Sequence, residues 1–265
     1  MNIVVCVKQV LDPEMPTDKF KVRDNQVVPP EGIPPVINPY DAQAVEAALR
    51  LKEKHGGKIT AITLSTAEAK DAVRRALAMG ADEGIVLSDE VFTGSDSLAT
   101  AYILTQAIQK IDAFDLVLCG REAADWSMGI VGPFIAERLN LPLITLAKAI
   151  ELLDNNILKV ERVIPDGYQV FEVPPPAVIT VSSEIGVPRL PTGMGIITAA
   201  RKEIPVWTNQ DIQADASLVG ANAKGSELLS LSIPEHERKC EIIGGETPDE
   251  VAANLAAKLR AAGAI

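Results

Sequence analysis

The sequence predicts an α/β fold: a Rossmann-like parallel sheet with helices on both faces, followed by a β-hairpin and an extended C-terminal arm. First, short apolar runs, typical of buried strands, alternate with segments of about a dozen residues whose apolar positions have the spacing of a helix. This alternation is typical of βαβ units. Second, an Asp-Gly turn at residues 166–167 separates two stretches of alternating polarity, which is typical of a hairpin. Third, periodicity is weak from about residue 205 to residue 239. We therefore predict an α/β domain over residues 1–204 and an arm with a final helix over residues 205–265.

Strands and helices alternate through the first half of the chain. Helix capping is expected from Asn38 or Asp41 in the first helix and from Ser95 or Asp96 in the third. The stretch between residues 8 and 39 has no helical period, and loops of such length are usually functional. The predicted strands cover residues 3–7, 59–64, 84–87 and 116–119, and the predicted helices cover residues 39–55, 67–79, 96–111 and 133–139.

The second half of the chain has a different rhythm. Residues 157–163 and 168–173 form the predicted hairpin, and residues 177–181 form a further strand. Residues 187–195 are predicted as an irregular loop, because they combine two prolines with two glycines. Thr247 followed by Pro and, three residues after the cap, by Glu predicts the start of a last helix that ends at residue 262.

Composition excludes several classes of function. The net charge of −11 and the pI of about 4.8 argue against non-specific nucleic-acid binding. Three cysteines without a C-x-x-C motif indicate a reducing compartment, so we expect a cytoplasmic protein, and we expect neither a membrane span nor a signal peptide. His55 and His236 are expected at the surface, and we predict no metal site and no catalytic residue. The absence of a phosphate-loop motif or a histidine-based nucleophile favours a binding or carrier role over an enzyme.

The turn after the fourth strand is the strongest candidate site. An apolar strand there passes through small residues into a helix start that contains glycine, and such a turn directs backbone N–H groups and the positive end of a helix dipole outward. Because the carboxyl ends of parallel strands meet at one edge, the turns after Val7 and Leu64 should lie nearby. The pattern predicts a nucleotide phosphate site, and an ordinary strand-to-helix turn remains the alternative.

Several motifs resemble those of one family. They are Val-Cys-Val-Lys-Gln-Val at residues 5–10, Ile-Asn-Pro-Tyr-Asp at residues 37–41, Ala-Leu-Ala-Met-Gly-Ala-Asp at residues 76–82, Gly-Arg-Glu-Ala at residues 120–123, Val-Glu-Arg at residues 160–162 and Pro-Arg at residues 188–189. Spread over nearly the whole chain, these motifs resemble the β subunit of electron-transfer flavoproteins.

The resemblance implies an electron carrier, a heterodimer with an α subunit that holds most of a redox FAD. It implies that residues 205–265 pack on that partner subunit and that the β subunit buries a structural AMP. The residues expected around the adenine nucleotide are Cys6, Asn38, Leu64, Ala123, Asp125, Trp126, Ser127, Met128, Gly129, Ile130, Val131 and Gly132. Tyr40 and Pro13 are the candidates for the edge that faces FAD.

The sequence departs from the family pattern at the phosphate turn. Met128 and Ile130 replace the family's Thr and Gln, which removes polar partners for a phosphate, although backbone donors survive such changes. Trp126 is expected either to stack on a base or flavin or to pack in the structure. The alternative to AMP is a second FAD, as in flavin-bifurcating relatives that oxidise NADH, and only in that case would the complex be an enzyme. AMP is the favoured expectation.

The resemblance also implies a partner-docking loop that contains Arg189, Leu190, Gly193 and Met194. Gly193 stands where the family has an anchoring leucine, and Met194 is the expected replacement anchor. The implied partners are a dehydrogenase donor, such as an acyl-CoA dehydrogenase, and a quinone oxidoreductase or ferredoxin as acceptor. The alternative is that this loop packs on the α subunit.

Overall fold

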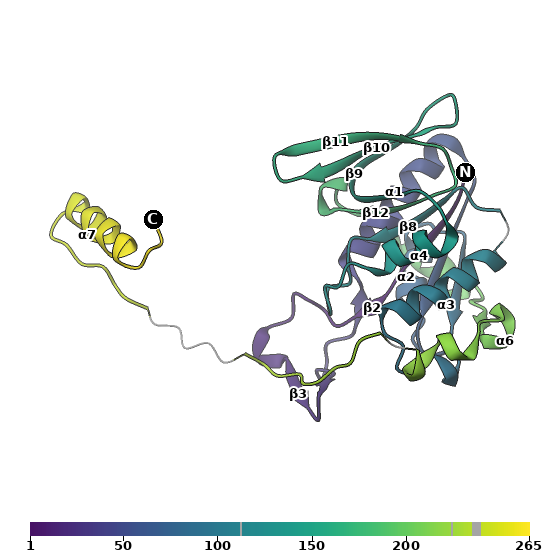
Figure 1. Cartoon of the computed structure of the whole chain (residues 1–265), viewed down its shortest axis with the longest axis horizontal. Coiled ribbons are helices and arrows are strands. Elements are labelled where there is room, and N and C mark those ends of the chain that lie inside the picture. The colour runs from purple at the N-terminus through teal and green to yellow at the C-terminus, as the bar shows by residue number, and fades with distance from the viewer. Residues whose placement is uncertain (112, 224, 235–239) are drawn as a thin grey trace.

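The computed structural model describes residues 1–111, 113–223, 225–234 and 240–265. Over these residues the predicted α/β fold is confirmed, because one largely parallel sheet has helices on both faces (Figure 1). In spatial order its strands are β11 (Gly167–Val173), β10 (Leu158–Ile164), β9 (Leu143–Leu152), β12 (Ala177–Val181), β8 (Leu116–Gly120), β1 (Asn2–Cys6), β6 (Lys58–Leu64), β7 (Glu83–Leu87) and β13 (Val206–Trp207).

The central strands send alternate side chains into two separate apolar layers. In β1, Ile3 and Val5 belong to one layer while Val4 and Cys6 belong to the other, as the two-residue period of a strand requires. Nearly every residue of β1, β8 and β12 is buried, which explains why these strands are continuous apolar runs.

Each apolar layer is covered by its own set of helices. The first layer includes side chains of α1, α2 and α5, and the second includes side chains of α3, α4 and α6. The helices are α1 (Pro39–His55), α2 (Asp71–Met79), α3 (Ser97–Lys110), α4 (Val131–Leu139), α5 (Gly193–Arg201), α6 (Asn209–Ile212) and α7 (Pro248–Ala261). The prediction of helices on both faces is thus confirmed, although α2 begins at Asp71 and not at Ala67, since residues 67–68 form a turn and residues 69–70 are irregular.

Short elements fill the connections. The long first loop contains two small antiparallel pairs, β2 (Gln9–Val10) with β5 (Val36–Ile37) and β3 (Lys21–Arg23) with β4 (Gln26–Val28). Single 3-10 turns lie at Thr17–Lys19, Glu90–Phe92, Ser183–Ile185, Ala216–Leu218 and Gly220–Asn222.

The predicted hairpin is confirmed as β10 paired antiparallel with β11. The sequence analysis did not identify β9, which pairs antiparallel with β10 and parallel with β12 and so makes the hairpin continuous with the main sheet. A register shift interrupts the β9–β12 pairing where Leu146 has a φ of 56°, and the Leu146 N–H donates to the Thr180 hydroxyl at 3.1 Å.

Two stretches differ from the expected irregular structure. The loop predicted through residue 195 is wrong from Gly193 onward, because α5 begins there with the Thr192 side chain accepting a hydrogen bond from the Gly195 N–H at 3.0 Å. The first part of the predicted arm lies on the domain: β13 adds a strand beside β7, and Ile212 and Val219 are buried in the second apolar layer.

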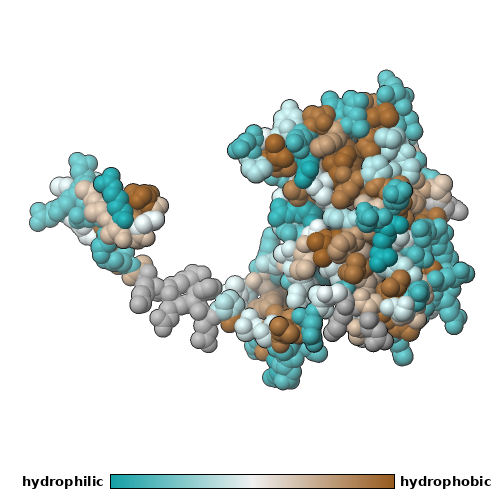
Figure 2. All heavy atoms as spheres, in the orientation of Figure 1, coloured by the Kyte–Doolittle hydropathy of each residue, from teal (hydrophilic) through white to brown (hydrophobic). Residues whose placement is uncertain are grey.

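The predicted last helix is confirmed as α7, which begins with a side-chain cap from Thr247 to the Glu250 N–H. Figure 1 shows α7 apart from the sheet domain. All of its residues are described and none is buried; apolar residues are visible on its surface in Figure 2. In the described part of the chain, no helix is both long enough and apolar enough to cross a membrane.

Candidate functional site

The strand order reverses between β1 and β8. From β1 the chain builds outward through β6 and β7, and it then returns to place β8 on the other side of β1. In open parallel sheets a ligand binds outside the carboxyl ends of the strands at such a switch point. The turn after β8, predicted as the phosphate site, lies at this edge.

Asn38 holds the backbone of the turn after β8 by two side-chain hydrogen bonds. It stands at the N-cap position of α1, yet its side chain does not cap the helix, so this part of the capping prediction is wrong. Its Nδ2 donates to the Glu122 carbonyl at 2.8 Å, and its Oδ1 accepts from the Ala124 N–H at 3.1 Å. Because Asn38 is fully buried and both ends of its amide are engaged, it orients the turn's backbone.

Asp41 links the two strands of the switch point. Its Oδ2 accepts from the Lys8 N–H at 2.8 Å and its Oδ1 from the Gly120 N–H at 3.2 Å. Gly120 permits this approach, since a Cβ there would lie 2.4 Å from the carboxylate. Burial raises the pKa of Asp41 to about 7, against the opposing effect of the hydrogen bonds that it accepts. Asp41 also does not cap α1 and instead fixes the carboxyl ends of β1 and β8.

Two cationic side chains form ion pairs with carboxylates of the turn after β8. Lys8 Nζ is 2.6 Å from a carboxylate oxygen of Asp125, and Arg121 pairs with Glu122 at 2.9 Å. The Arg121 guanidinium also stacks over the Tyr40 ring, 4.9 Å from its centroid. The sequence analysis missed Lys8, for which the signal is a basic residue just beyond an apolar strand at the predicted ligand edge.

The N-terminus of α4 has no side-chain cap. Ile130 occupies the N-cap position and makes no capping hydrogen bond, whereas Asp96 caps α3 as predicted. The N–H groups of the first helical turn have no partners within the helix, so an uncapped start is suited to an anion. Trp126 and Met128 beside it are 53% and 52% exposed.

The other residues expected around a nucleotide are arranged less uniformly. Cys6 is buried beside Cys119 in the second apolar layer, where the hydrogen bond with Cys119 and burial raise its pKa. Leu64 ends β6 and is half-buried against the same layer. Of the turn residues, Asp125 and Ser127 are exposed, Ala123, Gly129, Ile130 and Val131 are half-buried, and Gly132 is buried.

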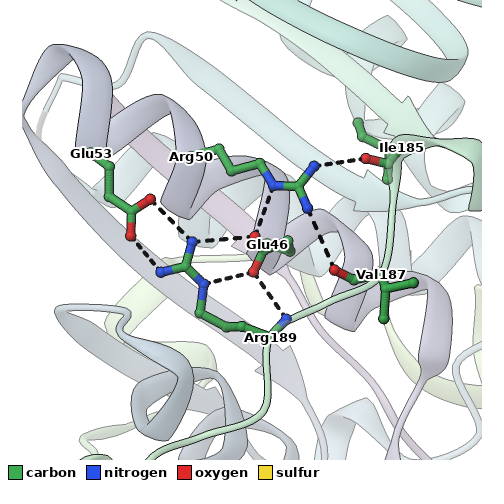
Figure 3. A network of polar contacts seen from close by, with 6 residues as sticks. All are labelled: Glu46, Arg50, Glu53, Ile185, Val187 and Arg189. Carbon is green, nitrogen blue, oxygen red and sulfur yellow. Dashed lines mark hydrogen bonds and ion pairs between the residues drawn. The ribbon is translucent and has the colours of Figure 1, made fainter.

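A second group of candidate residues lies beside α1, around residues 185–201, which we call the α5 segment. Arg189 is half-buried, and its guanidinium binds Glu46 and Glu53 of α1 (Figure 3). The sequence analysis missed Glu46, an acidic residue within an otherwise apolar stretch of the helix.

The α5 segment exposes a row of apolar side chains. Leu190 is 81% exposed and Met194 is 71% exposed, while Gly193 is also at the surface. The opposite face of α5 packs on α2, since a Cβ at Gly195 would lie 2.4 Å from the Ala78 carbonyl oxygen. The apolar side chains therefore point away from the domain.

Among the described residues, no group of three or more His, Cys, Asp or Glu side chains is placed to hold a metal ion. His55 is half-buried at the end of α1, and His236 lies outside the described residues.

Comparison with known proteins identifies the family of this fold. Residues 27–212 match the electron transfer flavoprotein domain. The chain belongs to the electron transfer flavoprotein β-subunit family. It is 40% identical over 256 residues to the electron transfer flavoprotein subunit beta of Thermoanaerobacterium thermosaccharolyticum, covering 95% of each chain. The corresponding subunit of Clostridium acetobutylicum is 38% identical, with 98% of each chain covered. The caffeyl-CoA reductase–Etf complex subunit CarD of Acetobacterium woodii is 37% identical, also over 98% of each chain.

Membership of this family implies association with a flavin and an α subunit as partner. The matched region includes the whole turn after β8 and the whole α5 segment.

Proposed function

We propose that this chain is half of a heterodimeric electron carrier that covers part of an FAD held mainly by the α subunit and buries an AMP at the turn after β8. The observation that supports the nucleotide is the uncapped start of α4 at the switch point, and two cations, Lys8 and Arg121, are paired with carboxylates of the same turn. These donors suit a phosphate even though Met128 and Ile130 supply no polar side chain. FAD, when bound, supplies the redox chemistry.

The residues around the nucleotide have different proposed roles. Backbone N–H groups of Val131 and Gly132 would hold the phosphate, Lys8 would neutralise its charge, and the exposed Trp126 ring would stack on the base. Asn38 and Asp41 would position the backbone of the turn and would not contact the nucleotide, because their polar atoms are engaged with the backbone of residues 120–124 and of Lys8. Tyr40, stacked under Arg121, stays the proposed flavin-facing side chain.

Cofactor analysis tests this proposal. The chain is co-expressed with its α subunit, the heterodimer is denatured, and released nucleotides are separated and identified by mass spectrometry. We expect one FAD and one AMP per heterodimer. Two FAD and no AMP would instead favour the NADH-oxidising, flavin-bifurcating alternative, and one FAD alone would contradict a nucleotide at the turn.

A variant pair sharpens the same measurement. Lys8→Gln should lower the AMP content while leaving FAD in place, because it removes a cation beside the proposed phosphate. Lys19→Gln, in the exposed 3-10 turn at Thr17–Lys19, is the matched control and should leave both contents unchanged. Equal AMP in both variants would remove Lys8 from the proposed site.

We also propose that the α5 segment docks the redox partner and that α7 packs on the α subunit. Leu190 and Met194 provide exposed apolar anchors for the proposed donor, an acyl-CoA dehydrogenase, and the relative in A. woodii is named as a subunit of a caffeyl-CoA reductase–Etf complex. Met194→Asp should raise the KM of a reduced acyl-CoA dehydrogenase for the carrier without loss of FAD. Deletion of residues 240–265 should lower the yield of heterodimer, since α7 buries none of its residues within this chain.

A further inference from the structure

The α5 segment is attached to α1 by an ionic cluster with a buried carboxylate at its centre. Glu46 is 5% exposed, and a buried charge is unfavourable unless it is paired and hydrogen-bonded. It accepts hydrogen bonds from the backbone N–H, Nε and Nη2 of Arg189 and from Nε of Arg50, at 2.8–3.2 Å. Although burial raises it, these bonds hold the pKa of Glu46 below its ordinary value. The carboxylate is therefore both charged and satisfied.

In this cluster Arg189 uses four of the five N–H donors of its guanidinium. Its guanidinium donates to Glu46 through Nε and Nη2 and to Glu53 through Nη1 and Nη2, as Figure 3 shows. A planar fork of this kind fixes direction as well as distance. Arg189 is thus directed at helix α1 of the same chain, and most of its donors are used there.

Arg50 fixes the chain just before Arg189. Its Nη1 donates to the Ile185 carbonyl at 3.0 Å and its Nη2 to the Val187 carbonyl at 3.5 Å. Between them Gly186 has a φ of 118°, and a Cβ there would lie 3.0 Å from Arg50 Nη1. The path of the backbone through residues 185–189 is consequently fixed by Arg50, Arg189 and the buried Glu46.

The other end of the α5 segment is also attached to the domain. Arg74 Nη1 donates to the Ala199 and Ala200 carbonyls at 3.1 Å, and just after the segment Lys202 Nζ donates to the Asp82 carbonyl at 2.6 Å. Leu190 and Met194 lie between these two attachments and are the most exposed of the apolar residues there, which also include Ile196 and Ile197. A surface held in one orientation before binding lowers the entropic cost of association.

We propose that Glu46 is a positioning residue for partner docking, which through Arg189 holds Leu190 and Met194 in the orientation that a redox partner binds. This inference rests on the docking role proposed above for the α5 segment. It assigns Arg189 to support of the surface and not to contact with the partner.

The test uses the FAD-loaded heterodimer and an acyl-CoA dehydrogenase reduced by its acyl-CoA substrate. Glu46→Gln keeps the side-chain shape and removes the charge, so Arg189 should release the segment. We expect the KM for the carrier to rise about fivefold with kcat and FAD content unchanged, since ordering of the surface is then part of binding. Glu151→Gln, which breaks the exposed pair with Lys54, is the matched control and should leave KM unchanged.

Hydrogen exchange provides a readout that does not need the partner. The amides of residues 186, 187, 189 and 190 should exchange faster in Glu46→Gln than in the parent heterodimer, while Glu151→Gln should match the parent. Unchanged exchange at these amides, or a loss of FAD, would overturn the positioning role. If Glu46→Gln fails to assemble, Arg50→Gln, whose side chain is half exposed, should show the same faster exchange and higher KM.

Met194→Asp separates the two proposals. A raised KM in Met194→Asp together with a parent-like KM in Glu46→Gln would mean that the α5 segment docks partners but Glu46 does not position it. A parent-like KM in Met194→Asp would contradict docking itself, whatever Glu46 does.

Discussion

Helix α1 holds two distant segments by two different kinds of interaction. Its N-terminus holds the turn after β8 through Asn38 and Asp41, whose side chains hydrogen-bond to backbone groups. Its middle holds the α5 segment through Glu46, Arg50 and Glu53, which bind arginine side chains and carbonyls. The first arrangement fixes where backbone N–H groups point, as a ligand site needs, and the second fixes the orientation of a surface.

The largest effect is expected at Asp41. Asp41→Ala leaves the Lys8 and Gly120 N–H groups without their acceptor in a buried position, so the free energy of unfolding should fall by about 3 kcal/mol. Denaturant unfolding of the heterodimer at fixed concentration measures it. Asp115→Ala, which removes the acceptor of the exposed Asn2 N–H, should cost less than half as much. Equal losses would show that the switch point is no more sensitive than the surface.

Asp41 also predicts a pH dependence. Its pKa is raised from an ordinary 3.8 to about 7 by burial, so the folded state binds more protons than the unfolded state between these values. The stabilisation from protonated Asp41 is therefore complete below about pH 4 and is lost as the pH rises towards 7. In Asp41→Asn this decline in unfolding free energy should disappear. A decline of unchanged slope would assign it to another group.

Asn38→Ala should have the next largest effect, about 2 kcal/mol, because it leaves the Ala124 N–H and the Glu122 carbonyl unpaired. Hydrogen exchange should become faster at residues 122–126 and stay unchanged at residues 186–190. Asn155→Ala, at an exposed turn, serves as the control. Faster exchange in both segments would mean that α1 as a whole is loosened.

The smallest effect is expected at Glu53. This residue is exposed, and Arg189 retains Glu46 as its buried partner, so Glu53→Gln should change the free energy of unfolding by less than about 1 kcal/mol. Added salt should reproduce the effect in the parent protein, because exposed pairs are screened. A loss as large as that of Asn38→Ala would show that Glu53, and not Glu46, dominates the ionic attachment.

Local patterns in the sequence were sufficient for most of the fold. Alternation of apolar strands and helices, the Asp-Gly hairpin and the Thr247 cap each depend on neighbouring residues, and each was confirmed. The start of α5 was missed because two glycines disfavour a helix. Packing of Gly195 on α2 and the Arg74 contacts at the far end stabilise it from outside the segment. β9 was missed because this segment is a strand through its pairing with β10 and β12, which a local sequence pattern does not show.

The candidate site was predictable in place but not in detail. The edge at β1 and β8 follows from parallel strands, whereas the Asn38 contact with Glu122 joins residues 84 apart in sequence. Likewise, Arg189 and Glu46 are 143 residues apart. No local pattern shows that a helix-start asparagine will leave its own helix uncapped to hold another turn.

The positions of the cysteines allow the C-terminal region to be labelled selectively. Cys6 and Cys119 are buried within the sheet domain, while Cys240 is exposed just before α7. Because alkylating reagents need an accessible thiolate, a maleimide dye should attach to Cys240 alone in the native protein. Fluorescence from that one position would then follow the α7 region as the second subunit joins, without any engineered cysteine.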